Sequence, residues 1–400
     1  MRFSTFFQAN GQLGATLLIT GCCIGAGMLG MPVMSAMAGF IPTTLAMALC
    51  YCFTTFTGLL ILEATLWFNG NVNLPSIVEM TLGKFGKVMT LLLFLFLFYC
   101  LFVAYLDGGG ALFADIISSL IHHSVSRAIG ILACVSFVGI ITYLGTQLVD
   151  GINRSLLLGL VISYCILVCI GLPKVSQANL KHMDLTASLA TIPILLICFG
   201  YHNLVPSITY YLKKNVNAIR FAIIVGNLIP FFVYLLWNFV ILGMLNSADI
   251  HSSLKADMVT DLLQGASSSL SIIVFVKMFS LFAMLTSFIP TAISFADFLK
   301  DGFKKTFRAE QKNDFVLYGL VFIPPLICTL FYPHLFLQAL GFAGGFIDVL
   351  LFGALPATVI LVGRNIKKME GPYQVIGGNL TPIIILLSSA LVLLLKLKGS

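Results

Sequence analysis

Apolar residues along this chain form long runs, separated by short segments that carry most of the charged residues. A helix needs about 20 apolar residues to cross the hydrocarbon core of a membrane. The pattern therefore predicts eleven spans in one transmembrane domain, residues 1–400. Residues 107–121 are too polar for a clean span and either extend the third helix or form an interfacial segment. The predicted spans are residues 13–37, 42–67, 88–106, 128–148, 155–172, 186–209, 218–245, 268–297, 315–332, 335–362 and 380–397.

Composition supports an all-α polytopic membrane protein, because 59% of the residues are hydrophobic and only 9% are charged. Soluble domains carry about 25% charged residues. With the N-terminus in the cytoplasm, 15 of the 22 Lys and Arg residues fall in cytoplasmic segments, 6 fall on the other side, and Lys277 lies inside a span. This bias favours a cytoplasmic N-terminus. The net charge of +7 follows from these loops and does not indicate a nucleic-acid partner.

The first span is interrupted by small residues between positions 19 and 32. Glycine costs about 1 kcal/mol in a helix interior relative to alanine, and proline about 3 kcal/mol. Such a segment is either a helix broken at mid-depth, which must line a cavity or be buried, or a close contact between two helices. The residues concerned are Gly21, Gly25, Gly27, Gly30 and Pro32.

A second interruption lies in the sixth span, at Phe199 to Asn203, between Pro193 and Pro206. The two interrupted spans are separated by five spans, an odd number, so the second set of five enters the membrane inverted. This pattern is typical of transporters built from two inverted repeats, with substrate held at paired helix breaks. The predicted repeats are residues 13–172 and 186–362, and residues 380–397 form an accessory helix.

Several motifs resemble the hydroxy and aromatic amino acid permeases, and most closely the tyrosine-specific permeases of bacteria. They are Asn10-Gly-Gln-Leu-Gly-Ala-Thr, Gly25-Ala-Gly-Met-Leu-Gly-Met-Pro, Phe199-Gly-Tyr-His-Asn-Leu-Val-Pro-Ser-Ile and the Thr286-Ser-Phe…Asp297-Phe-Leu stretch. The resemblance covers nearly the whole chain and implies the five-plus-five fold of the amino acid–polyamine–organocation superfamily. It also implies proton symport of tyrosine, or else of tryptophan or phenylalanine, across the bacterial inner membrane by alternating access. Asn203 and Leu204 depart from the small residue that relatives usually carry after the histidine.

The broken helices suggest how an amino acid would bind. A half-helix beginning near Gly25 offers free N–H groups and a positive dipole end to the substrate carboxylate. Carbonyls near Thr20 to Cys23 and near Phe199 could accept its ammonium group, and His202 or Asn203 could bind a phenolic hydroxyl. The predicted substrate-binding residues are Cys23, Ile24, Gly25, Ala26, Gly27, Met28, Phe199, Gly200, Tyr201, His202, Asn203 and Phe282.

Ionisable residues inside the bilayer are functional candidates, because each is costly there. The proton-coupling candidates are His202, Lys277, Glu63 and Asp348. Each has a structural alternative: His202 could bond unwound backbone as a neutral ring, and Lys277 could extend toward the surface. Sodium coupling is the rival hypothesis, with hydroxyls of Thr286 and Ser287 as ion ligands.

Other functional classes fit less well. Of the six histidines only His202 lies in mid-span, so no catalytic set or metal site is expected, and neither enzyme activity nor a cofactor is predicted. The sequence contains no repeated filter motif of the kind that would indicate a channel. The ten cysteines lie in apolar segments and are interpreted as packing residues. The expected partners are an aromatic amino acid, protons and membrane lipid.

Overall fold

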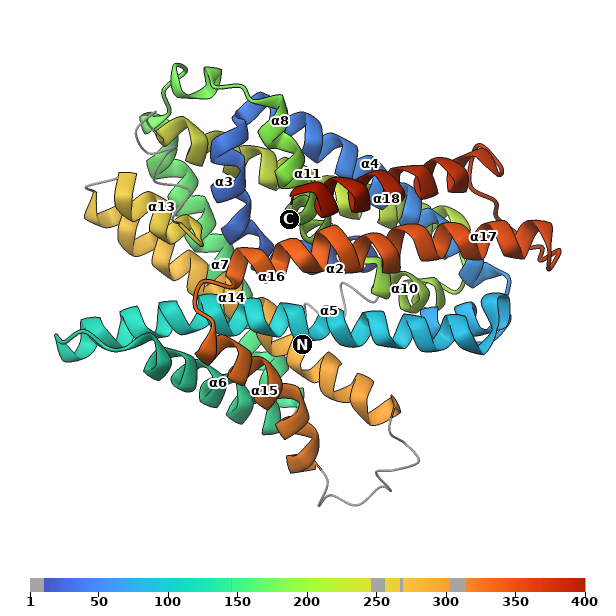
Figure 1. Ribbon diagram of the computed structural model, residues 1–400, viewed down its shortest axis with the longest axis horizontal. Helices are drawn as coiled ribbons and strands as arrows, with labels where there is room; N and C mark the ends of the chain where they lie inside the picture. The colour runs from blue at the N-terminus through green and yellow to red at the C-terminus, as the bar shows by residue number, and fades with distance from the viewer. Residues whose placement is uncertain (1–10, 145, 246–255, 267–268, 303–313, 400) are drawn as a thin grey trace.

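The computed structural model describes residues 11–144, 146–245, 256–266, 269–302 and 314–399, and the regular secondary structure in these ranges is helical. The predicted all-α membrane architecture is confirmed. The longest helix, α5 (Leu74–Ile121), runs along the long axis of the molecule (Figure 1). The ends of α4 (Phe40–Leu66) and α17 (Leu355–Asn365) gather at the right of that view, and the end of α5 lies at the left.

Each predicted span overlaps a helix or a broken helix, but three bounds differ. The third helix begins at Leu74 and not at residue 88, the fourth ends at Tyr143 and not at residue 148, and the fifth begins at Thr146 and not at residue 155. Eight helices of the described chain are long and apolar enough to cross a membrane. A further span is the bent pair α2 (Gly11–Cys23) and α3 (Gly27–Ala38), which turns by 58° at its break. Two shorter apolar helices, α6 (Arg127–Tyr143) and α15 (Asp314–Phe331), cover the remaining two predicted spans.

The other spans are continuous or divided into short helices. α5 is kinked at Gly83, where φ is 82°. The continuous spans besides α4 are α7 (Thr146–Gly171), α11 (Val216–Met244), α14 (Leu270–Gly302) and α18 (Leu380–Gly399). The sixth span comprises α8 (Leu185–Ser188), η3 (Leu189–Thr191), α9 (Ile192–Cys198), η4 (His202–Leu204) and α10 (Val205–Tyr211). The tenth comprises α16 (Phe336–Phe342), the π-helix η7 (Ala343–Ala354) and α17. The short helix α13 (Val259–Ala266) precedes α14.

The third helix is longer than predicted, because residues 107–121 continue α5 rather than forming a separate segment. Asp107 is buried in this extension and forms an ion pair with Arg127 at the start of α6. Its Oδ2 also accepts the N–H groups of Leu335 and Phe336, each at 3.1 Å. The buried carboxylate therefore caps the N-terminus of α16, where N–H groups lack intrahelical acceptors.

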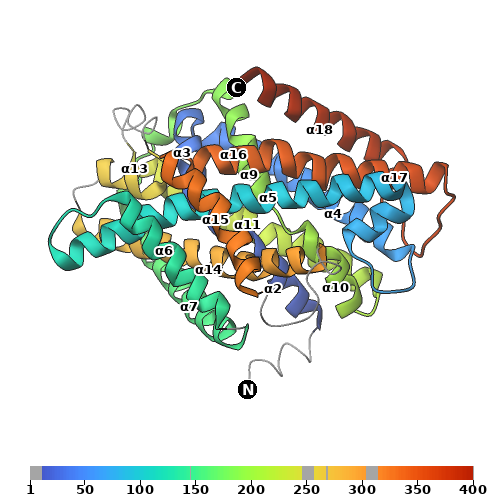
Figure 2. The same ribbon diagram turned by 60° about the horizontal axis from the view of Figure 1, so that its bottom comes forward.

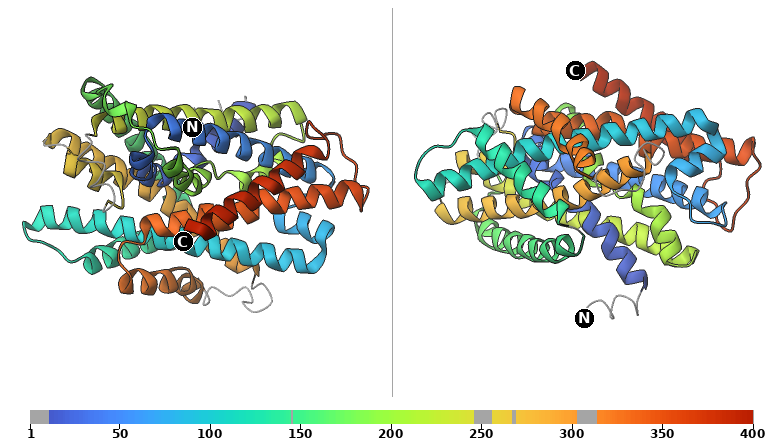
Figure 3. Two further views of the ribbon diagram at one scale, coloured as in Figure 1. Left: turned by 45° about the horizontal axis from the view of Figure 1, so that its top comes forward. Right: turned by 90° about the horizontal axis from the view of Figure 1, so that it is seen from below.

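The tenth span lies beside α5 along much of its length (Figure 2), and α18 crosses the outer side of the tenth span (Figure 3). The interior is apolar, and Trp237, Tyr201 and Tyr234 are among its largest fully buried side chains. All three lie close to the helix breaks. All ten cysteines have free thiols.

Candidate substrate site at the two helix breaks

The first span unwinds between Cys23, the last residue of α2, and Gly27, the first residue of α3. The N–H of Ala26 leaves the helix and donates to Ser287 Oγ of α14 at 3.0 Å. The N–H groups of Gly25 and Gly27 have no hydrogen-bond acceptor among the described residues. Free N–H groups at the start of a helix carry the positive end of its dipole and suit a carboxylate.

Unwinding also frees carbonyl oxygens at the end of α2. In a continuous helix the carbonyls of Gly21 and Cys22 would accept the N–H groups of Gly25 and Ala26, but neither bond forms between these described residues. Both Gly21 and Cys22 are exposed, and open space adjoins Gly21. Cys22 Sγ donates to the Gly200 carbonyl at 3.4 Å. Cys22 therefore lies beside the second break.

Close packing explains the glycines of the first break. A Cβ atom on Gly25 would lie 2.2 Å from Ser287 Oγ, and one on Gly27 would lie 2.6 Å from Cys198 Sγ. The broken segment is thus pressed against α14 on one side and against the end of α9 on the other. Of the other predicted residues in this segment, Ile24 is half-buried, whereas Cys23, Ala26 and Met28 are buried.

The second break is attached to α4. Tyr201 Oη donates to the Thr54 carbonyl at 2.9 Å. His202 Nε2 lies 2.7 Å from Thr57 Oγ1 and 3.2 Å from the same carbonyl. Both aromatic side chains are buried, whereas Asn203 is exposed. Of the polar side chains predicted here, Asn203 is therefore the one on an open surface.

A residue that sequence reasoning missed joins the two breaks. Tyr234 Oη of α11 lies 2.6 Å from the carbonyl of Cys23 and 3.0 Å from the carbonyl of Cys198. These are the last residues of α2 and α9. A tyrosine hydroxyl carries one proton, so the two carbonyls share a single donor. A tyrosine in an apolar span gives no sequence signal for this role.

Two buried polar atoms lie without a hydrogen-bond partner in the described chain where η7 meets the second break: His202 Nδ1 and Asp348 Oδ1. The His202 ring is stacked between Tyr201 and Phe352, at centroid distances of 4.7 and 4.9 Å. Asp348 lies four residues before Phe352, and its Oδ2 is 3.8 Å from the position that a Cβ on Gly200 would take. π-helices such as η7 are frequent at functional sites.

Three predicted residues lie elsewhere. Lys277 Nζ pairs with Asp115 Oδ2 of α5 at 2.8 Å. Glu63 pairs with Arg364 of α17 through two hydrogen bonds of 2.6 and 2.7 Å. The Phe282 ring packs against Gly159 of α7. Phe199 is buried and contacts the Tyr234 ring edge-to-face at 5.5 Å, so it does belong to the junction of the breaks.

Comparison with known proteins assigns the chain to a family. The model of the tryptophan/tyrosine permease family matches residues 8–396. The chain is 33% identical to tyrosine-specific transport system 1 and 32% identical to tyrosine-specific transport system 2, both of Haemophilus influenzae, over 96% of each chain. It is 27% identical to the tryptophan-specific transport protein of the same organism, over 92% of this chain and 91% of the relative. The protein is a multi-pass membrane protein that belongs to the tryptophan/tyrosine permease family.

Proposed function

We propose that this protein imports an aromatic amino acid, tyrosine in the first place, by proton symport across the bacterial inner membrane. The observation that carries the proposal is that the N–H groups of Gly25 and Gly27 and the carbonyls of Gly21 and Cys22, all in the unwound part of the first span, have no hydrogen-bond partner among the described residues. These groups complement the two charges of an amino acid without a fixed side-chain charge. The names of the two relatives at 32–33% identity support tyrosine as substrate, and tryptophan is the alternative.

The substrate side chain would lie toward Asn203. An exposed amide in the middle of a span would be costly against lipid, so the surface that carries it suits a water-filled path. The amide can hydrogen-bond a phenolic hydroxyl, and a site that binds a hydroxyl discriminates against substrates lacking it. We expect Asn203→Ala to reduce the preference for tyrosine over phenylalanine by about tenfold in competition assays. An unchanged preference would remove Asn203 from the site.

Asp348 is the proton carrier that we favour, with His202 as the alternative. A buried carboxylate without a cation is costly as an anion, and Asp348 Oδ1 lacks a partner in the described chain. Protonation would neutralise it, and its position next to Gly200 would couple that change to the second break. Lys277 and Glu63 are weaker candidates, because each already pairs with an opposite charge.

Sodium coupling is less consistent with the same geometry. Ser287 Oγ already accepts the N–H of Ala26, and a cation site would require oxygen ligands at this point instead of an N–H group. Thr286 Oγ1 donates to the Phe282 carbonyl at 2.8 Å. Only the Ser287 contact counts against a cation here, because Thr286 Oγ1 uses its proton and keeps its lone pairs available.

Uptake of radiolabelled tyrosine into proteoliposomes tests the proposal. An inward proton gradient should drive accumulation of tyrosine without sodium. Competition by unlabelled tryptophan and phenylalanine then ranks the affinities of the protein for these two amino acids. If uptake requires sodium, the coupling ion is wrong and Thr286 and Ser287 become the ion ligands. If folded protein accumulates no aromatic amino acid, the substrate assignment fails.

Asp348→Asn separates coupling from binding, because asparagine keeps the size of the side chain but cannot take up a proton. We expect the variant to lose accumulation driven by the pH gradient, by at least tenfold, while tyrosine exchange between equal concentrations persists. His202→Gln provides the comparison for the neighbouring group. Wild-type accumulation by Asp348→Asn would exclude Asp348 as the proton carrier.

The proposed orientation places the N-terminus in the cytoplasm and the C-terminus outside. It rests on the excess of basic residues in the segments assigned to the cytoplasm. A reporter enzyme that is active only outside the cytoplasm should be active when it is fused at Ser400. Inactivity of this fusion, with activity of an equivalent fusion after Lys368, would reverse the orientation.

A further inference from the structure

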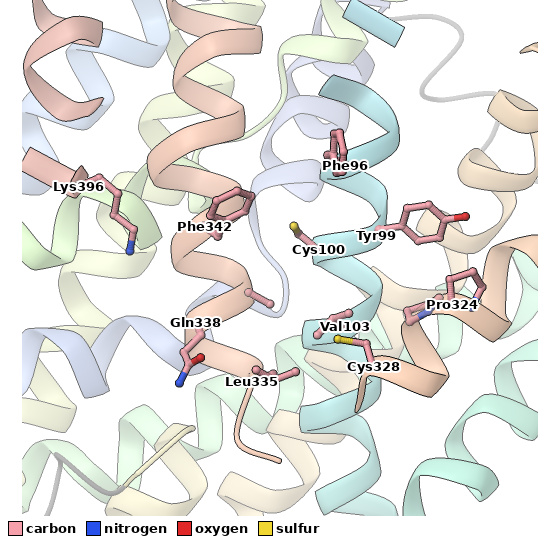
Figure 4. Close-up of a pocket in the computed structure, with 12 residues that line it drawn as sticks. Phe96, Tyr99, Cys100, Val103, Pro324, Cys328, Leu335, Gln338, Phe342 and Lys396 are labelled. Atoms are coloured by element: carbon pink, nitrogen blue, oxygen red, sulfur yellow. The ribbon is translucent and has the colours of Figure 1, made fainter. Parts of the chain in front are cut away.

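A cleft of about 870 Å³ lies on the outside of the bundle between α5, α15 and α16, with the end of α18 at its rim (Figure 4). Its walls are mostly apolar, and Phe96 and Phe342 are 56% and 45% exposed, so the cleft is open to the surroundings of the bundle. In a chain that spans a membrane, such an apolar surface faces lipid. The remaining walls include Cys100, Val103, Pro324, Cys328 and Leu335.

One rim of the cleft is polar. Lys396 of α18 and Gln338 of α16 lie on the same side of it, across from Cys100 (Figure 4). The stem of Lys396 packs on η7, with Cδ 3.4 Å from the position of a Cβ on Gly345. No described carboxylate pairs with the Lys396 ammonium. The cleft therefore combines an apolar floor with a positive charge that no carboxylate of the described ranges pairs with.

The depth of this charge fits a lipid headgroup. Lys396 Nζ lies 3.6 Å from the position of a Cβ on Gly341, five residues after the first residue of α16. At 1.5 Å per residue, this is about 7 Å from the end of that helix. The Lys396 side chain runs from Gly345 toward Gly341, so its charge points toward this end of the helix and the headgroup region, as long basic side chains near span ends do. Basic sites between transmembrane helices bind anionic headgroups.

We propose that this cleft binds one anionic phospholipid, with an acyl chain between α5 and α16 and the headgroup phosphate on Lys396. Gln338 supplies an amide donor to the same headgroup. In the proposed orientation the lipid belongs to the outer leaflet. None of the lining residues lies at the helix breaks, so lipid binding can be tested without the proposed substrate and without a proton gradient.

Native mass spectrometry of the full-length protein in detergent, titrated with phosphatidylglycerol or with phosphatidylcholine of the same acyl chains, tests this site. Wild-type protein should bind one phosphatidylglycerol at least tenfold more tightly than phosphatidylcholine. Lys396→Gln should reduce phosphatidylglycerol affinity to the level of phosphatidylcholine. The control is Lys181→Gln, which removes an exposed lysine distant in sequence from Lys396. It should leave the affinity for phosphatidylglycerol unchanged.

Ala339→Leu tests the acyl-chain part of the cleft, because it adds bulk to the wall and retains Lys396. It should weaken binding of both lipids. Equal binding of the two lipids by wild-type protein, or wild-type affinity in either Lys396→Gln or Ala339→Leu, would overturn the proposal. Melting temperatures measured in the same detergent show whether each variant is folded.

Discussion

At the scale of single residues, the junction of the two breaks depends on one hydroxyl. Tyr234 Oη is the donor available to the terminal carbonyls of α2 and α9. Both carbonyls carry the negative end of a helix dipole, so without the shared proton they would repel each other. The hydroxyl thus holds together two half-helices that belong to different parts of the chain.

Tyr234→Phe should raise the KM for tyrosine by about fivefold, because relaxation of the junction lowers the fraction of protein that is competent to bind. The maximal rate should change less than KM. Tyr164→Phe is the matched control, since its hydroxyl donates to the Val233 carbonyl at 3.0 Å and not to a break. Kinetics of uptake in proteoliposomes measure both. Equal KM values for the two variants would show that Tyr234 does not position the breaks.

The contact between Gly25 and Ser287 gives a second prediction at this scale. Gly25→Ala would place Cβ 2.2 Å from Ser287 Oγ and should reduce transport at least tenfold. Gly25→Ala combined with Ser287→Ala should recover part of it, because the Ser287 Cβ lies at an ordinary contact distance of 3.5 Å. Uptake normalised to the amount of folded protein measures the effect. A double variant no better than Gly25→Ala alone would contradict the steric explanation.

At the scale of helices, prolines leave carbonyl oxygens without partners, and side chains of other spans satisfy them. Pro32 lacks an N–H group, so it cannot donate to the Met28 carbonyl one turn earlier. Trp237 Nε1 of α11 donates to that carbonyl at 3.1 Å. This bond meets the requirement that backbone polar groups in a membrane find a partner within the protein.

A side chain of α2 likewise satisfies a carbonyl oxygen that a proline leaves free in α11. Pro230 lies inside α11 and lacks the N–H group that would bond the Gly226 carbonyl, so Thr20 Oγ1 of α2 donates to that carbonyl at 3.0 Å. The first and seventh spans therefore satisfy each other's irregularities. Together with the Tyr234 bond, these contacts fix the first break against α11.

Thr20→Val should lower stability by about 1 kcal/mol, since interhelical hydrogen bonds in membranes are of this order. Thr44→Val is the control, because Thr44 Oγ1 donates to the Phe40 carbonyl of its own helix. Thermal unfolding in detergent should show a lower melting temperature for Thr20→Val than for Thr44→Val. Indistinguishable melting temperatures would show that water replaces the lost donor.

The sequence predicted the elements well because the interruptions consist of glycine and proline, which are visible in an apolar run. The eleven helical segments and the breaks near Gly25 and Gly200 all correspond to the structure. Partners of side chains were not predictable in this way. Tyr234 has no periodic signal, and the ion pair of Lys277 with Asp115 joins residues 162 positions apart. Which ionisable residue carries the proton stays a prediction.

At the scale of the whole molecule, charged contacts attach the tenth span at both ends. Asp107 of α5 caps α16 at one end. Glu63 of α4 binds Arg364 of α17 at the other end and accepts the N–H of Val375 at 2.7 Å. The side chains of Glu63 and Arg364 are only 2% and 8% exposed. The tenth span therefore connects α5 to α4.

Glu63→Gln should destabilise the protein by about 3–5 kcal/mol, because it leaves the Arg364 charge buried without its counterion. Glu63→Met combined with Arg364→Met should be milder, since it removes both charges. The control is Glu79→Gln, which breaks a 2.6 Å ion pair with Lys87 whose side chains are 37% and 39% exposed; such surface pairs contribute about 0–1 kcal/mol. Thermal unfolding in detergent ranks the three variants. If Glu63→Gln melts at the temperature of Glu79→Gln, then water reaches the Arg364 charge and the contact does not secure the end of the tenth span.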